Sequence, residues 1–111
     1  MRLQYNYNVV IMYSGAKMKF EWDDKKNQSN IKKHGVSFEE AQTVFYSENA
    51  IVFDDPEHSH SENRMLIVGF SSYGKLLLSC YCEKQGDVIR IISARKLTKT
   101  ETKDFNKRWG K

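Results

Sequence analysis

Apolar residues in the first half of the chain recur at the spacing of an α-helix. Phe38, Ala41, Val44 and Phe45 lie three or four positions apart, so they share one face of a helix. The run opens at Ser37 with the order Ser-Phe-Glu-Glu, a capping box in which the serine and the second glutamate satisfy free N–H groups. The pattern therefore predicts an amphipathic helix that begins at this serine.

A shorter and more polar helix is predicted over residues 24–33. Asp23 suits its N-cap, since a carboxylate accepts hydrogen bonds from the first turn. Gly35 suits the left-handed position that follows many helices. Residues 20–22 have the aromatic content of a short strand, so the first elements of the domain are a strand and two helices.

The second half of the chain has the apolar runs and turn residues of an antiparallel sheet. Ser72 to Lys75 and Gln85 to Asp87 are turn segments, and each separates two strand-like runs. A final helix opens with a second capping box, formed by Thr98 and Glu101. The predicted strands are residues 50–53, 64–71, 76–83 and 88–93. This order predicts an α+β fold, in which two N-terminal helices and one C-terminal helix pack on an antiparallel sheet of three to five strands.

One domain is expected, because 111 residues form a single modest core and the chain has one proline and no repeats. We assign residues 18–111 to this domain and residues 1–17 to an N-terminal extension, with Met18 as an alternative start. Residues 9–13 are too short for the apolar core of a signal peptide and, if ordered, add an edge strand. No apolar run reaches the roughly 20 residues of a membrane span. We therefore expect a cytoplasmic protein with no membrane partner.

Positive charge is concentrated near the C-terminus. Residues 84–111 contain nine Lys and Arg against three Asp and Glu, whereas residues 1–83 contain nine against eleven. A basic patch of this kind is typical of proteins that bind a polyanion such as nucleic acid. The alternative interpretation is an ordinary solvated helix face.

Arg90 and Arg95 stand out in the predicted sheet, because arginine is almost never fully buried without a partner. The planar guanidinium matches phosphate oxygens, which favours a phosphate-binding strand. Strict alternation places the two arginines on opposite faces, so a shared phosphate requires a bend or bulge near Ser93-Ala94. The alternative is that one arginine belongs to the scaffold and pairs with a carboxylate such as Glu62 or Glu83.

Two groups of residues have the chemistry of metal ligands. Cys80 and Cys82 share one face of a predicted strand, and we expect them to be core residues rather than a disulfide. No second Cys/His pair accompanies them to complete a structural metal site. His58 and His60 lie beside carboxylates in the polar loop over residues 54–63, but their spacing matches no established zinc pattern. A solvated loop and an active-site loop are the alternatives, and we assign no metal and no cofactor.

Groups able to transfer protons lie beside basic residues at two places. His34 follows Lys33 at the end of the first helix, where a cationic helix terminus is the alternative interpretation. Glu62 and Arg64 lie where the polar loop rejoins the sheet. The chain has no glycine-rich phosphate loop and no nucleophile elbow. The chemistry left for such a site is metal-independent cleavage of RNA, in which the substrate's 2′-OH attacks the phosphate and the protein supplies a base, an acid and cations.

Several segments resemble the BrnT toxin family, in the order of that family and over residues 18 to about 109. They are residues 20–23 (FEWD), 30–41 (with KHGVSFEEA), 62–64 (ENR) and 90–95 (RIISAR). The resemblance implies a RelE-like α+β fold and the metal-independent endoribonuclease activity of a type II toxin that stops translation. It also implies a cognate BrnA-type antitoxin with a DNA-binding domain, which neutralises the toxin. The toxin is then expected to contact DNA only indirectly, through this antitoxin. Residues 1–17 have no counterpart in the family.

The matching segments contain polar residues to which we assign roles as a hypothesis: Lys33, His34, Glu62, Arg64, Arg90, Ser93 and Arg95. Glu62 or His34 is the expected general base, and Arg64, Arg90 and Arg95 are expected to bind phosphate. The expected RNA-binding residues are Lys33, Ser93, Lys96 and Lys99. Two rival functions remain. A non-catalytic module that binds nucleic acid or a partner protein would use the same basic surface, and a metal hydrolase would be built on the histidine loop.

Overall fold

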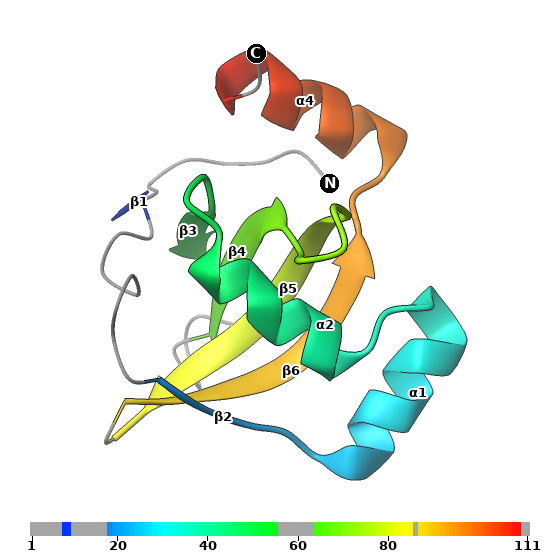
Figure 1. The fold of residues 1–111 in the computed structure, drawn as a ribbon, viewed down its shortest axis with the longest axis vertical. Coiled ribbons are helices and arrows are strands. Elements are labelled where there is room, and N and C mark those ends of the chain that lie inside the picture. The colour runs from blue at the N-terminus through cyan, green and yellow to red at the C-terminus, as the bar shows by residue number, and fades with distance from the viewer. Residues whose placement is uncertain (1–7, 10–17, 56–63, 86, 110–111) are drawn as a thin grey trace.

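The computed structural model describes residues 8–9, 18–55, 64–85 and 87–109. In this part of the chain, six strands form one sheet in the order β1-β3-β4-β5-β6-β2 (Figure 1). No helix among these residues is long and apolar enough to cross a membrane. The strands are β1 (Asn8–Val9), β2 (Lys19–Glu21), β3 (Ile51–Asp54), β4 (Arg64–Phe70), β5 (Leu76–Lys84) and β6 (Val88–Lys96). The helices are α1 (Asp24–His34), α2 (Phe38–Thr43), the 3₁₀ helix η2 (Val44–Tyr46) and α4 (Lys99–Trp109).

The α+β class, the two N-terminal helices and the C-terminal helix are confirmed, but the sheet differs from the purely antiparallel one predicted. β3, β4, β5 and β6 form the expected antiparallel meander. β2 lies on the other side of β6 and runs parallel to it. A parallel pair needs a long crossover, and here the whole segment from α1 to β5 forms it. β1, from the N-terminal extension, pairs antiparallel with β3 at the opposite edge.

The larger hydrophobic cluster lies between the sheet and the α2–η2 segment, which crosses one face of the sheet in Figure 1. Phe38, Ala41 and Val44 are fully buried, as their helical spacing predicted. The ring of Phe45 meets Tyr81 of β5 edge-on, with centroids 4.9 Å apart. Edge-to-face pairs of this kind stabilise the core beyond simple burial.

The opposite face of the sheet carries a second cluster, and α4 covers one end of it. Leu78 and Cys80 of β5 are buried there together with Phe105 of α4. The Phe105 ring lies 6.2 Å from the ring of Phe70 and 5.5 Å from that of Trp109. α4 is therefore attached where β4 and β6 end. The opposite end of this face is not covered by α4 and carries the polar side chains of the candidate site.

The predicted helix caps form at α1 and α2, with one departure. Asp23 caps α1, and Gly35 follows it with a left-handed φ of 68°. Ser37 Oγ accepts a hydrogen bond from the Glu40 N–H at 3.0 Å. The Glu40 carboxylate does not return to the cap and instead accepts a 2.7 Å hydrogen bond from Ser71 Oγ. This contact ties α2 to the turn between β4 and β5.

A buried asparagine of α1 completes the hydrogen bonding of β6. β2 pairs only with the first three residues of β6, so the same edge needs another partner further along. The Asn30 side chain accepts from the Ala94 N–H at 3.2 Å and donates to the Ala94 carbonyl at 2.7 Å. It also donates to the Val36 carbonyl at 2.8 Å. Asn30 thus takes the place of a neighbouring strand and holds α1 against β6.

Candidate active site

Two arginines face each other across β5 on the sheet face that also carries the second cluster. Arg64 of β4 lies opposite Cys82 of β5, and Cys82 lies opposite Arg90 of β6. Neighbouring strands are about 4.8 Å apart, which places the two arginine Cα atoms roughly 10 Å from each other. Both guanidinium groups can therefore reach one phosphate held above Cys82.

Carboxylates lie at both ends of this line of residues. Asp55, the residue after β3, donates its N–H to the Arg64 carbonyl at 3.1 Å. Glu21 of β2 lies opposite Arg90, and its Oε2 accepts a 2.7 Å hydrogen bond from Arg90 Nη1. We call Asp55, Arg64, Cys82, Arg90 and Glu21 the charged row. It crosses the sheet from β3 to β2, with its two cations inside and its two acids outside.

A pocket of about 460 Å³ opens over the basic part of the charged row. Arg64 and Arg90 line it together with Lys26 of α1 and Lys84 of β5. Cys82, Glu83 and Ile92 complete the lining. The lining has four cations and one carboxylate, and the pocket keeps a net positive charge even when Glu21, the partner of Arg90, is included. A positive pocket suits a phosphodiester.

The position of Lys26 depends on the cap of α1. The Asp23 carboxylate accepts a hydrogen bond from the Lys26 N–H at 3.1 Å, which fixes the first helical turn beside the pocket. This backbone hydrogen bond is the main cause that lowers the pKa of Asp23. The carboxylate is therefore ionised at neutral pH and keeps the cap in place.

A β-bulge places Arg90 and Arg95 on the same face of the sheet. The register between β5 and β6 shifts at Cys80/Tyr81: Tyr81 lies opposite Ile91 and Cys80 lies opposite Ser93. Ile92 is the extra residue, and it reverses the alternation of all later residues in β6. The distortion required for a shared face is thus present, at Ile92-Ser93.

Arg95 nevertheless pairs with a buried carboxylate, which supports the second of the two alternatives, a role in the scaffold. Its Nη1 and Nη2 donate to the two Glu101 oxygens at 2.7 and 2.9 Å, and the Glu101 side chain is 0% exposed. Glu101 also forms the predicted capping box with Thr98, in both directions. Burial opposes ionisation of Glu101, but the hydrogen bonds from Arg95 and Thr98 outweigh it and lower the pKa. The hydrogen bond to Glu101 likewise raises the pKa of Arg95.

The other expected site residues lie apart from the pocket or outside the described residues. Lys33 and His34 are exposed at the C-terminal end of α1. His34 lies about 12 Å from Lys26 along the helix axis. The Ser93 carbonyl accepts a hydrogen bond from Ser79 Oγ at 2.9 Å. Lys96 and Lys99 are exposed at the α4 end of the molecule, whereas Glu62, His58 and His60 lie outside the described residues.

Cys80 and Cys82 are both buried and free, as predicted. Cys80 Sγ lies 3.6 Å from Asp55 Oδ2, to which it donates. Burial, with the nearby Asp55 charge, raises the pKa of the Cys80 thiol to about 12. The Cys80 thiol is therefore protonated at neutral pH and is part of the core. Among the residues that the structure describes, no group of three or more His, Cys, Asp or Glu side chains is arranged to hold a metal ion.

Sequence reasoning missed Lys26, Lys84 and both acids of the charged row. Glu21 was hidden because its strand pairs with β6, far away in the chain and in parallel. Asp55 was assigned to a polar loop, although it extends the ladder of β3 by one hydrogen bond. For Lys26 and Lys84 the sequence showed only the positive charge, which does not predict that the side chain lines a particular pocket.

Comparisons with known proteins agree with this architecture. The family model described as the ribonuclease toxin BrnT of type II toxin–antitoxin systems matches residues 22–101, more than half of the chain. The crystal structure of the ribonuclease toxin BrnT from Brucella abortus has a TM-score of 0.60 and 24% sequence identity to this chain. The match covers 75% of this chain and 100% of the Brucella chain, which shows a shared fold. A comparison with curated proteins finds no match. The extent of the family match shows that the chain belongs to the BrnT family, the ribonuclease toxins of type II toxin–antitoxin systems.

Proposed function

We propose that this toxin cleaves RNA in the pocket between Arg64 and Arg90, without a metal ion. The observation that carries the proposal is the placement of these two arginines on either side of Cys82, on one face of the sheet. Two guanidinium groups about 10 Å apart at their Cα atoms can hold one phosphate from two sides. Lys26 and Lys84 in the same pocket are available for the neighbouring phosphates.

The reaction that fits this pocket is attack of the substrate's 2′-OH on the adjacent phosphorus. The 2′-oxygen–phosphorus bond forms, the bond to the 5′-oxygen breaks, and a cyclic phosphate and a 5′-hydroxyl result. A base removes the 2′-OH proton, and an acid protonates the leaving 5′-oxygen. Arg64 and Arg90 stabilise the negative charge that develops on the phosphate oxygens.

Glu62 is our choice for the general base. It precedes Arg64 by two residues in the sequence, so the chain itself keeps the two residues close together. His34, the other candidate, lies at the opposite end of α1 from Lys26. We therefore prefer Glu62, whose sequence neighbour Arg64 lines the pocket, to His34.

The test compares Arg64→Ala and Arg90→Ala with Lys75→Ala, which removes an exposed cation from the β4–β5 turn, away from the pocket. We expect each arginine variant to cleave RNA about 10²- to 10³-fold more slowly, since each loses one group that stabilises transition-state charge. The lysine control should cleave normally, and EDTA should not slow the wild type. Full activity in both arginine variants would overturn the site, and loss of activity in EDTA that Mg²⁺ restores would overturn the metal-independent reaction.

Membership of a type II toxin family implies an RNA target and an antitoxin partner. We propose that RNA cleavage by this toxin inhibits translation in the cytoplasm, and that the partner is a BrnA-type antitoxin with a DNA-binding domain. The toxin would then contact DNA only through that partner. Expression of the toxin alone should arrest growth and protein synthesis, and co-expression of the antitoxin from the neighbouring gene should relieve both. Growth arrest without any loss of full-length RNA would contradict this proposal.

A further inference from the structure

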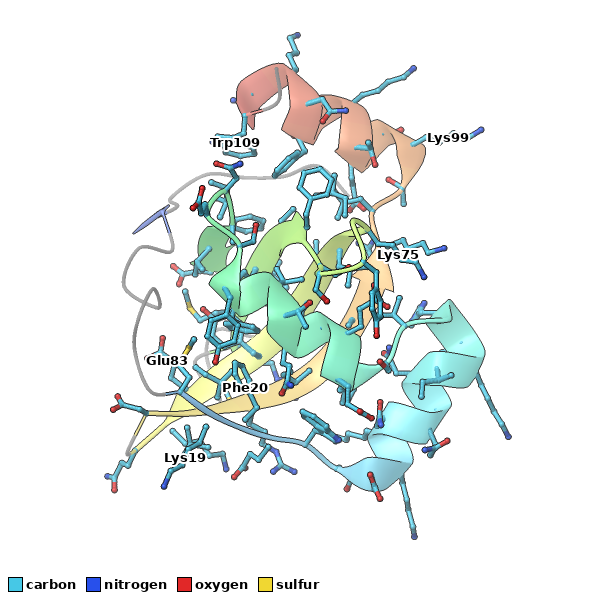
Figure 2. All side chains as sticks on the ribbon, in the orientation of Figure 1. Lys19, Phe20, Lys75, Glu83, Lys99 and Trp109 are labelled. Atoms are coloured by element: carbon cyan, nitrogen blue, oxygen red, sulfur yellow. The ribbon has the colours of Figure 1, made fainter. Side chains whose placement is uncertain are left out.

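α4 carries a row of lysines on the side that faces away from the sheet. Lys99, Lys103 and Lys107 are spaced four residues apart, so they follow one side of the helix with a rise of about 6 Å between neighbours. All three are exposed, whereas Glu101 and Phe105 of the same helix are buried. In Figure 2, Lys99 extends outward and Trp109 lies on the side of α4 that faces the rest of the molecule. We call Lys99, Lys103 and Lys107 the lysine stripe.

The acidic residues of α4 form ion pairs with arginines rather than with the lysine stripe. α4 contains two acidic residues, and both are paired with arginine: Glu101 with Arg95, and Asp104 with Arg108. No ion pair joins a lysine of the stripe to a carboxylate in the described part of the chain. Lys96, at the end of β6, is also exposed and adds a fourth positive charge next to the stripe. The surface therefore presents a linear series of lysine ammonium groups.

The lysine stripe and the pocket lie at opposite ends of the molecule. Figure 1 places α4 at one end, with α1 and the β5–β6 hairpin at the other, and Figure 2 shows Glu83 of the pocket far from α4. Lys96 lies six positions after Arg90 in β6, which is roughly 20 Å along an extended strand. One phosphate cannot bridge this distance, so the two basic surfaces contact different parts of any shared ligand.

We infer that the lysine stripe is a second RNA-binding surface, which holds the backbone of a long RNA while a distant phosphate of the same molecule occupies the pocket. This inference rests on the proposed ribonuclease function. RNA is the occupant that the charge pattern favours, because a regular series of phosphates complements a regular series of lysines without base-specific contacts. The stripe has no aromatic side chain on its own face that could serve as the anchor of a protein interface.

The experiment uses the full-length triple variant Lys99→Gln, Lys103→Gln, Lys107→Gln. Glutamine keeps the helix propensity and removes three charges from exposed positions, so the fold should be preserved. Two substrates are compared: a long RNA that the wild type cleaves, and a fragment of about five nucleotides around the same cut, roughly 17 Å at a stacked rise of 3.4 Å. The fragment can occupy the pocket but cannot reach the stripe. We expect the triple variant to have a raised KM for the long RNA and unchanged kinetics on the fragment.

Binding provides a readout that is independent of cleavage. Each phosphate contact adds about 0.7 to the slope of log affinity against log salt for a single strand, so the triple variant should lose about 2 from the slope. Over a fourfold rise in salt, the wild type should lose about 20-fold more affinity for the long RNA than the variant does. The matched variant with Lys→Arg at the same three positions should behave as the wild type, because it keeps the charge.

The outcomes separate this inference from the proposed function. An unchanged salt slope for the long RNA in the triple glutamine variant overturns the inference, even if the wild type cleaves both substrates. A wild type that binds the long RNA with the expected slope difference but cleaves neither substrate supports the second surface and overturns the ribonuclease proposal. An equal rise of KM on the long RNA and on the fragment also overturns the inference, because the fragment cannot contact α4.

Discussion

Removal of Arg95 should reduce stability rather than catalysis, because its two strong hydrogen bonds go to a buried carboxylate. We consider Arg95→Met, which keeps most of the side-chain volume. The change leaves the Glu101 carboxylate, 0% exposed, without the contacts of 2.7 and 2.9 Å that it now accepts. Loss of one partner from a buried ion pair costs about 3–5 kcal/mol. The Thr98 N–H still donates to Glu101 at 2.9 Å and Arg95 is 29% exposed, so we expect the lower end, about 3 kcal/mol.

Urea unfolding measures this loss, and RNA cleavage per mole of folded protein measures the effect on the site. We expect cleavage within about threefold of the wild type, because Arg95 does not line the pocket. The double variant Arg95→Met, Glu101→Leu should recover stability to within about 1 kcal/mol of the wild type, since an apolar pair leaves no charge without a partner. A loss of stability below about 1 kcal/mol, together with a 100-fold loss of cleavage, would refute the scaffold role and assign Arg95 to catalysis.

The pH dependence of stability gives a further check on the same pair. The pKa of Glu101 is lowered in the folded protein, so the ionised carboxylate stabilises the fold above the unfolded pKa of about 4.3. This stabilisation is lost as the pH falls through the lower folded value. The wild type should therefore lose stability below about pH 4 more steeply than the double variant.

Two more substitutions test the scaffold and the charged row. Asn30→Ala removes three hydrogen bonds to the main chain, two of them to Ala94, and should lower the free energy of unfolding in urea by about 3 kcal/mol. The control, Gln28→Ala on the exposed side of the same helix, should lower it by less than about 0.5 kcal/mol. Equal losses in the two variants would contradict the role of this asparagine in closing the edge of β6. Glu21→Gln frees Arg90 from a competing carboxylate and should lower the KM for RNA by up to about fivefold, since a partly exposed ion pair is worth at most about 1 kcal/mol. A tenfold rise in KM would instead mean that Glu21 positions the arginine.

The elements of this fold could be predicted from the sequence because their signals are local. Asp23 and Ser37 mark the helix starts, and Gly35 marks a helix end, through contacts within a few residues. The β3–β6 meander follows from apolar runs that are separated by turn residues. The position of β2 has no such signal, because pairing with a parallel strand 69 residues further along the chain requires no particular sequence in the three residues of β2.

The faces of β6 could not be predicted for a related reason. Alternation assigns Arg90 and Arg95 to opposite faces, and one extra residue at Ile92 reverses this assignment. The sequence around Ile92 contains no glycine and no proline that would indicate a bulge. The partner of Arg95 was also missed. Glu62 and Glu83 were the carboxylates considered for it, whereas Glu101 was assigned only to the cap of the last helix, a role that it combines with the contact to Arg95.

The two arginines of β6 differ in the carboxylates that they contact more than in their own environment. Arg90 and Arg95 are exposed to a similar extent, 35% and 29%. Their partners are not: Glu21 is 42% exposed, whereas Glu101 is fully buried. When a phosphate displaces Glu21, water solvates the released carboxylate, so the exchange costs little. Displacement of Glu101 would leave a buried charge without a partner, so Arg95 cannot exchange its carboxylate for substrate. The exposure of the partner acid therefore favours Arg90, rather than Arg95, as the arginine of this strand that we propose to bind phosphate.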